Sequence, residues 1–99
     1  MNTQKNITPL MEQYLKIKKI HSDSLLFFRM GDFYELFFED AIITARELNI
    51  TLTKRGRVLN ESIPMCGIPF HAANNYVPKL VKKGVDIAIC EQTNSPEEM

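Results

Sequence analysis

The segment Arg29–Phe37, with the sequence RMGDFYELF, constrains the fold of this chain more than any other. It overlaps the end of a dense apolar run, residues 25–30, and continues through Gly31 and Asp32, a pair that is typical of a tight turn. A second short run of apolar residues follows the turn. The pattern therefore predicts two consecutive extended segments joined by a turn.

The residues after this turn place a large aromatic ring and a carboxylate two positions apart. Side chains of an extended segment alternate between two faces, so Phe33 and Glu35 would share one face and Tyr34 and Leu36 the other. A flat ring beside a hydrogen-bond acceptor suits a site that tests whether a base stack can be opened. The competing interpretation is an ordinary half-buried strand with Phe33 in the core and Glu35 on the surface, and spacing alone favours it.

Composition limits the class of protein. Ninety-nine residues with 44% hydrophobic and 24% charged side chains indicate one ordinary globular domain. No apolar run approaches the roughly 18 residues of a membrane span, and no signal-peptide core begins the chain, so the cytosol is the default compartment. Twelve basic and twelve acidic residues give no net charge. This balance argues against tight DNA binding by the isolated domain, but not against a specificity element within a larger protein.

The cysteine and histidine residues do not form a metal-binding pattern. Cys66 and Cys90 are far apart in sequence, and neither His21 nor His71 completes a zinc-ligand spacing. We therefore expect two buried free thiols and no metal site.

The order of predicted elements indicates a mixed α/β fold. Thr8 and Pro9 are typical of a helix start, and helical spacing recurs over residues 40–49 and from His71 to Gly84, where Pro78 should kink or restart the helix. Extended segments are expected at residues 25–30, 33–36, 51–53, 63–68 and 85–90, with a basic tip at 54–57 and a polar tail at 94–99. The prediction is a single domain over residues 1–99, a mixed β-sheet covered by about three helices.

Evidence for catalysis within this chain is weak. There is no phosphate-binding glycine loop and no nucleophile motif, so no catalytic residue is predicted. Four carboxylates are clustered in sequence, as a magnesium-dependent nuclease would need: Asp32, Glu35, Glu39 and Asp40. Such nucleases usually place a lysine nearby, and none lies between Lys19 and Lys54. The structural alternative for Glu39 and Asp40 is a place in the first turn of the following helix.

Blocks along nearly the whole chain resemble one known family. They are TPLMEQYLKIK, FFRMGDFYELFFEDA, LTKRG, IPMCGIPFHA, NYVPKLVKKG and VDIAICEQT, in this order. Together they resemble the N-terminal mismatch-recognition domain of the MutS family of DNA mismatch-repair proteins. The Phe-x-Glu motif of that family corresponds to Phe33 and Glu35.

The resemblance implies a role for particular residues. Phe33 would enter the minor groove and stack on a mispaired or unpaired base, and Glu35 would hydrogen-bond to that base. The partner would be double-stranded DNA with mismatches or small insertion/deletion loops. The resemblance also assigns neighbouring contacts with the groove or the DNA backbone to Met30, Lys54, Arg55 and Arg57.

The resemblance further implies that the chain is a fragment. Members of the family continue to a domain that binds and hydrolyses ATP with magnesium, and they form homodimers that act with MutL in the bacterial cytoplasm, at the nucleoid. None of those cofactors is expected in this fragment, and one sheet edge is expected to lack its last strand. Two other functions remain as alternatives: a small metal-dependent nuclease, and a domain used purely for protein contacts with Phe33 as an anchor.

Overall fold

The structure is a computed structural model that describes residues 8–58 and 61–91. Its helices are α1 (Pro9–Ile20), α2 (Phe38–Leu48), the short 3-10 helix η2 (Phe70–Ala72) and α3 (Ala73–Lys82). Its strands are β1 (Leu25–Met30), β2 (Phe33–Phe37), β3 (Thr53–Val58), β4 (Glu61–Pro69) and β5 (Ile87–Cys90). These strands form one sheet in the order β3-β4-β2-β1-β5, in which only β1 and β5 are parallel. The predicted mixed sheet with about three covering helices is confirmed.

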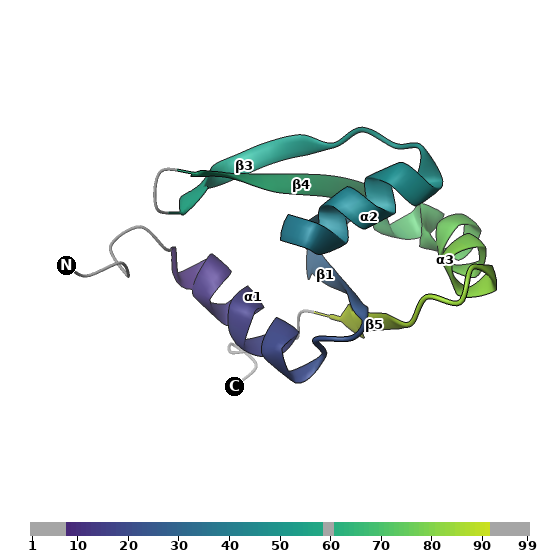
Figure 1. Ribbon diagram of the computed structural model, residues 1–99, viewed down its shortest axis with the longest axis horizontal. Coiled ribbons are helices and arrows are strands. Elements are labelled where there is room, and N and C mark those ends of the chain that lie inside the picture. The colour runs from purple at the N-terminus through teal and green to yellow at the C-terminus, as the bar shows by residue number, and fades with distance from the viewer. Residues whose placement is uncertain (1–7, 59–60, 92–99) are drawn as a thin grey trace.

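The sheet has a helical layer on each face. Alternate residues of β1 separate into two cores: Leu25 and Phe27 pack with α2 and α3, whereas Leu26 and Phe28 pack with α1. Figure 1 shows α1 apart from α2 and α3, with the long hairpin of β3 and β4 crossing the top. We call the side covered by α1 the α1 face, and the other side the α2/α3 face.

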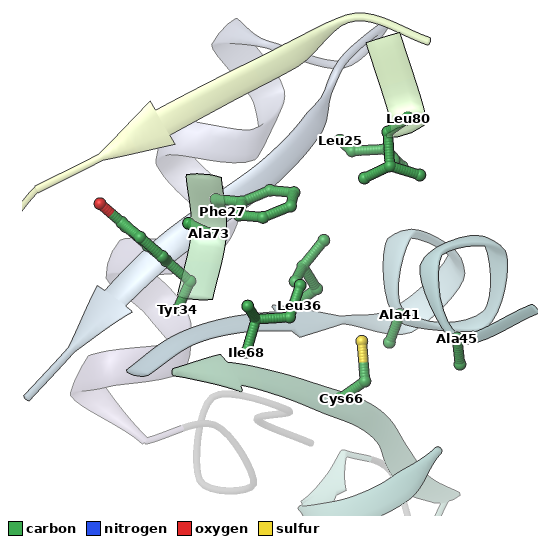
Figure 2. Close-up of a cluster of buried hydrophobic side chains, with 10 residues drawn as sticks. All are labelled: Leu25, Phe27, Tyr34, Leu36, Ala41, Ala45, Cys66, Ile68, Ala73 and Leu80. Atoms are coloured by element: carbon green, nitrogen blue, oxygen red, sulfur yellow. The ribbon is translucent and has the colours of Figure 1, made fainter. Parts of the chain in front are cut away.

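The larger core lies on the α2/α3 face. Figure 2 shows its side chains, which come from three strands and both covering helices: Leu25, Phe27, Tyr34, Leu36, Ala41, Ala45, Cys66, Ile68, Ala73 and Leu80. Two of the strand residues, Tyr34 and Leu36, come from β2 and are buried as alternation requires. Burial of an apolar side chain of this size contributes roughly 1.5–3 kcal/mol. The α2/α3 core therefore determines which face of β2 remains for Phe33 and Glu35.

Helix α1 begins where the sequence predicts. The Thr8 side chain accepts a hydrogen bond of 3.1 Å from the Met11 N–H, and Pro9 occupies the first helical position. Met11 and Tyr14 are buried against the sheet. The Tyr14 ring meets the Phe37 ring edge-on at 4.9 Å between centroids. These contacts hold α1 against the sheet.

A single carboxylate joins α1, β1 and α2. Asp40 lies in the first turn of α2, as expected, and its side chain is 7% exposed. Its Oδ2 accepts a hydrogen bond of 3.0 Å from the Leu26 N–H and lies 2.9 Å from Lys18 Nζ. The helix start has no side-chain cap, and Phe38 has a φ of 58°, which is strained for a bulky residue. Asp40 therefore stabilises a strand-to-helix turn that the local backbone does not favour.

The predicted basic tip is wrong, because these residues belong to a strand. β3 extends over Thr53–Val58, and its register with β4 shifts between Lys54 and Arg57. Gly56, with a φ of 60°, lies inside this shift, as the glycine of a β-bulge does.

β4 also begins before Pro64, at Glu61. Pro64 pairs only with Lys54 of β3, because β2 pairs with β4 only from Met65 onward, and such a position with one neighbouring strand tolerates proline better than a central one.

Two expectations for the C-terminal half are also wrong. The expected restart of the helix at Pro78 is wrong, because α3 runs through Pro78 as one segment, and the irregular turn lies earlier, at η2. Pro78 and Asn74, whose carbonyl loses its helical donor, are both exposed, so water can replace that bond. β5 is shorter than predicted and half-exposed, because among the described residues it pairs only with β1 at the sheet edge. The predicted polar tail, residues 94–99, lies outside the described residues.

Only one of the two thiols is fully buried. Cys66 is buried in the α2/α3 core, whereas Cys90 is partly exposed on the edge strand. Burial raises the pKa of the Cys66 thiol to about 11, with a smaller contribution from the negative charge of Asp40. None of the helices in the described part of the chain is long and apolar enough to span a bilayer.

Replacing Asp40 with alanine is expected to lower the free energy of unfolding by about 2–3 kcal/mol, because the Leu26 N–H and the Lys18 ammonium both lose their acceptor. Urea unfolding of the chain measures this change. The matched control is Glu39→Ala, which removes an exposed carboxylate from the same helical turn and should cost no more than about 1 kcal/mol. Equal losses for the two variants would contradict the role of Asp40.

The two thiols are expected to react at different rates with iodoacetamide in the folded chain at mildly alkaline pH. Cys90 should be modified first, since Cys66 is inaccessible and its raised pKa keeps it protonated. Mass spectrometry of peptides after timed labelling measures both rates, and Cys90→Ser serves as the control that isolates Cys66. Indistinguishable rates would show that Cys66 is not held in the core.

Candidate functional site

The α1 face is covered at one end of β2 and open at the other. Helix α1 packs on the end that carries Phe37 and leaves the end next to the Gly31 turn uncovered. Exposure rises accordingly along the face: Phe37 0%, Phe28 2%, the Glu35 side chain 15% and Phe33 45%. The open end of this face is the candidate site.

Phe33 is exposed at the open end of the strand. The register pairs it with Met30 on β1 and with Pro69 on β4. A Cβ atom added to Gly67 would lie 3.5 Å from Phe33 Cδ2, so the ring leans over the backbone of Gly67. Phe33 is 45% exposed, so the ordinary-strand interpretation, with Phe33 in the core, is wrong. Leaving about half of the ring exposed forgoes roughly 1 kcal/mol of burial.

Glu35 lies two residues after Phe33 on the same face of β2, and its side chain is mostly buried. The register places it between Phe28 on β1 and Gly67 on β4. Its Oε1 accepts a hydrogen bond of 3.1 Å from Arg55 Nη1, and the two charges form an ion pair. Arg55 is located on β3, which is separated from β2 by β4. The free domain therefore presents a bare aromatic ring beside a carboxylate that already has a cationic partner.

The turn that carries Phe33 is held by its neighbours. The Phe70 N–H donates a hydrogen bond of 2.8 Å to the Asp32 carbonyl, and Arg29 Nε donates one of 2.6 Å to the Gly31 carbonyl. Gly31 has a φ of 62°, a conformation that glycine adopts without strain. Both turn carbonyls are thus satisfied, which restricts the position of the Phe33 backbone.

A second set of contacts holds Arg29 in place. Its guanidinium lies 3.9 Å from the centroid of the Phe70 ring, and its Nη1 lies 2.9 Å from Glu91 Oε1. The Tyr34 hydroxyl donates to the other oxygen of Glu91, and this hydrogen bond is the main reason that the pKa of Tyr34 is raised. Figure 2 shows the Tyr34 hydroxyl pointing away from the buried cluster. β1, β2 and the residue after β5 are thereby joined beneath the turn.

The structure brings together some of the predicted site residues but not others. Met30 and Arg55 lie on the same face as Phe33 and Glu35. Lys54 is exposed and pairs with Pro64, so alternation places it on the opposite face. The backbone of Arg57 belongs to β3, and its side chain lies outside the described part of the structure.

The clustered carboxylates do not form a nuclease-like site. Asp40 is paired with Lys18 and Glu35 with Arg55, on different elements. Among the described residues, no group of three or more His, Cys, Asp or Glu side chains could hold a metal ion. The sequence also lacks a phosphate-binding glycine loop.

The sequence did not indicate that four further residues contribute to the site. They are Arg29, Gly67, Phe70 and Glu91. Their contacts with the turn and with Phe33 depend on strand register and on chain separations that local patterns do not encode. Gly67 has one weak signal, because a glycine inside a predicted strand often marks a close approach.

Comparison with known proteins now decides the family. Residues 8–99 match the family model described as MutS domain I. The chain belongs to the MutS domain I family. It is 60% identical over 95 residues to the DNA mismatch repair protein MutS of Bartonella quintana (strain Toulouse), a match that covers 96% of this chain and 10% of that protein. It is 59% identical over 97 residues to the DNA mismatch repair protein MutS of Bartonella tribocorum (strain CIP 105476 / IBS 506), covering 98% and 11%. The MutS domain I chain thus spans about a tenth of the length of these relatives.

Proposed function

We propose that this MutS domain I recognises mispaired or unpaired bases in double-stranded DNA, with Phe33 as a wedge and Glu35 as the group that contacts the base. The observation that carries the proposal is the exposed Phe33 ring at the open end of the α1 face. The mostly buried carboxylate of Glu35 lies two residues away on the same face of β2. Family membership supports the mismatch-repair role, since the relatives are DNA mismatch repair proteins.

The geometry is suited to a wedge. Residues two apart on one face of a strand are separated by roughly 6.6 Å, so a ring and a carboxylate can address the same opened base step. An apolar side chain inserted from the minor groove unstacks a step and kinks the duplex by about 20–90°. The hydrogen bonds to the turn before Phe33 would limit the displacement of its backbone when the ring contacts the base stack.

Discrimination follows from the cost of opening the duplex. A mismatched or unpaired base is already poorly stacked, so it costs less to displace than a paired base does. Glu35 adds a hydrogen bond that only a displaced base can offer, whereas near an intact duplex a carboxylate is repelled by the phosphates. Met30 would line the groove beside Phe33. Arg55 and Arg57 would neutralise phosphates. Lys54 lies on the opposite face of the sheet, so it is not part of this proposed contact.

The remaining parts of the proposal concern a complete protein of the relatives' length. Such a protein would bind and hydrolyse ATP with magnesium in another domain, form a homodimer and act with MutL. It would work in the bacterial cytoplasm, at the nucleoid. With no net charge, this chain neutralises few phosphates by itself, so most of the affinity for DNA would come from the other domains.

Replacing Phe33 with alanine in a full-length MutS that carries this sequence as its domain I should weaken binding to mismatched duplexes by about 1–3 kcal/mol, because the stacking surface is lost. Competition binding with matched and mismatched duplexes measures the change. Val81→Ala is the control, since Val81 is also an exposed apolar residue but belongs to α3 on the other side of the sheet. Unchanged mismatch preference in Phe33→Ala would favour the protein-contact alternative.

Replacing Glu35 with glutamine in the same protein should tighten binding to matched DNA, because the repelled charge is removed. Binding to mismatched DNA should change only modestly, because an amide still offers a hydrogen bond, so selectivity should fall. The same competition assay gives both values. An equal weakening on both duplexes would show that Glu35 does not discriminate between them.

A further inference from the structure

The carboxylate proposed to contact the base is not free in this structure. Glu35 is paired with Arg55 at 3.1 Å, and among the ion pairs of the described residues Glu35 has no other cation. Arg55 is also one of the residues proposed to neutralise a phosphate. Its guanidinium cannot remain in this pair and give its full charge to the DNA at the same time. The two proposed contacts therefore compete for the same residue.

The geometry of the ion pair would allow Arg55 to leave Glu35 for another partner. Arg55 reaches Glu35 across the intervening strand β4, through one nitrogen rather than through a bidentate fork. The Arg55 side chain is 41% exposed, so its charge remains accessible from solvent. The Glu35 side chain is 15% exposed and would be costly to leave unpaired in that position. Glu35 therefore needs a replacement partner before Arg55 can leave.

We propose that Arg55 is a specificity-determining residue that changes partners: it pairs with Glu35 in the free domain and on matched DNA, and moves to a backbone phosphate once Glu35 has a displaced base to contact. This inference rests on the function proposed above. On matched DNA no base is available, so Glu35 keeps Arg55 and the phosphate contact does not form. A mismatch thus adds two contacts together, one to the base and one to the backbone.

The number of phosphate contacts can be measured from the salt dependence of binding. Each phosphate contact made by a cationic side chain contributes about −0.9 to the slope of log affinity against log salt concentration. Between about 50 and 200 mM salt, a difference of about 0.9 in slope corresponds to about a 3.5-fold difference in the loss of affinity. The slope therefore distinguishes an Arg55 that contacts a phosphate from one that remains paired with Glu35.

The test uses Arg55→Gln in a full-length MutS carrying this sequence as domain I, with a short matched duplex and the same duplex containing one unpaired thymine. Glutamine keeps part of the aliphatic stem and removes the charge. We expect the slope on the mismatched duplex to become shallower by about 0.9, and the slope on the matched duplex to stay unchanged. Arg55→Lys should restore the slope on the mismatched duplex, because it keeps a cation at this position.

Lys83→Gln provides the matched control. Lys83 and Glu47 form an ion pair of the same length, 3.1 Å, at the ends of α3 and α2. Both slopes should be unchanged in this variant. Thermal unfolding of each variant shows whether the fold is retained, and Arg55→Lys supplies the comparison if Arg55→Gln is destabilised.

Two results would overturn the inference. Equal changes in slope on both duplexes would make Arg55 a permanent phosphate contact, and no change on either duplex would make it a permanent partner of Glu35. Neither result affects the function proposed for Phe33, which fails only if Phe33→Ala leaves mismatch preference intact. Failure of this inference can thus be distinguished from failure of the proposed function.

Discussion

Burial of Tyr34 and Leu36 in the α2/α3 core is the constraint on which the rest of the structure depends. Strand geometry then forces Phe33 and Glu35 onto the other face, whatever their own preferences. Helix α1 covers only part of that face, so the ring next to the turn stays exposed while Phe37 is fully buried. The exposed aromatic ring on β2 is thus a consequence of where the larger core lies, and its exposure costs only roughly 1 kcal/mol.

The local features of the fold could be predicted from the sequence because their causes are local. The Thr8 cap, the turn at Gly31 and the alternation after it depend on neighbouring residues alone. The same alternation left two interpretations of Phe33, and only the position of α1 decides between them. The resemblance to the MutS family therefore contributed what spacing could not, namely the assignment of Phe33 and Glu35 to DNA.

The rest of the site could not be predicted because it depends on long-range register. The ion pair of Arg55 with Glu35 requires β3 and β2 to flank β4, and a bulge at Gly56 to place the basic residues within a strand instead of a turn. Nothing near Glu91 in the sequence indicates that it contacts Arg29, 62 positions earlier. Similarly, the partial exposure of Cys90 follows from the edge position of β5, which hydrophobicity alone does not specify.

The central claim is that the Phe33 side chain enters the duplex at the mispaired base. Photocrosslinking tests it most directly, with benzoylphenylalanine in place of Phe33 in a full-length MutS carrying this domain, bound to a duplex with one unpaired thymine. The same substitution at Phe70, the other exposed phenylalanine of this region, is the control. The account predicts a crosslink from position 33 that maps to the unpaired thymine or its immediate neighbours, and none from position 70. Crosslinks from position 33 that are spread along the duplex, or that form only with protein, would contradict it.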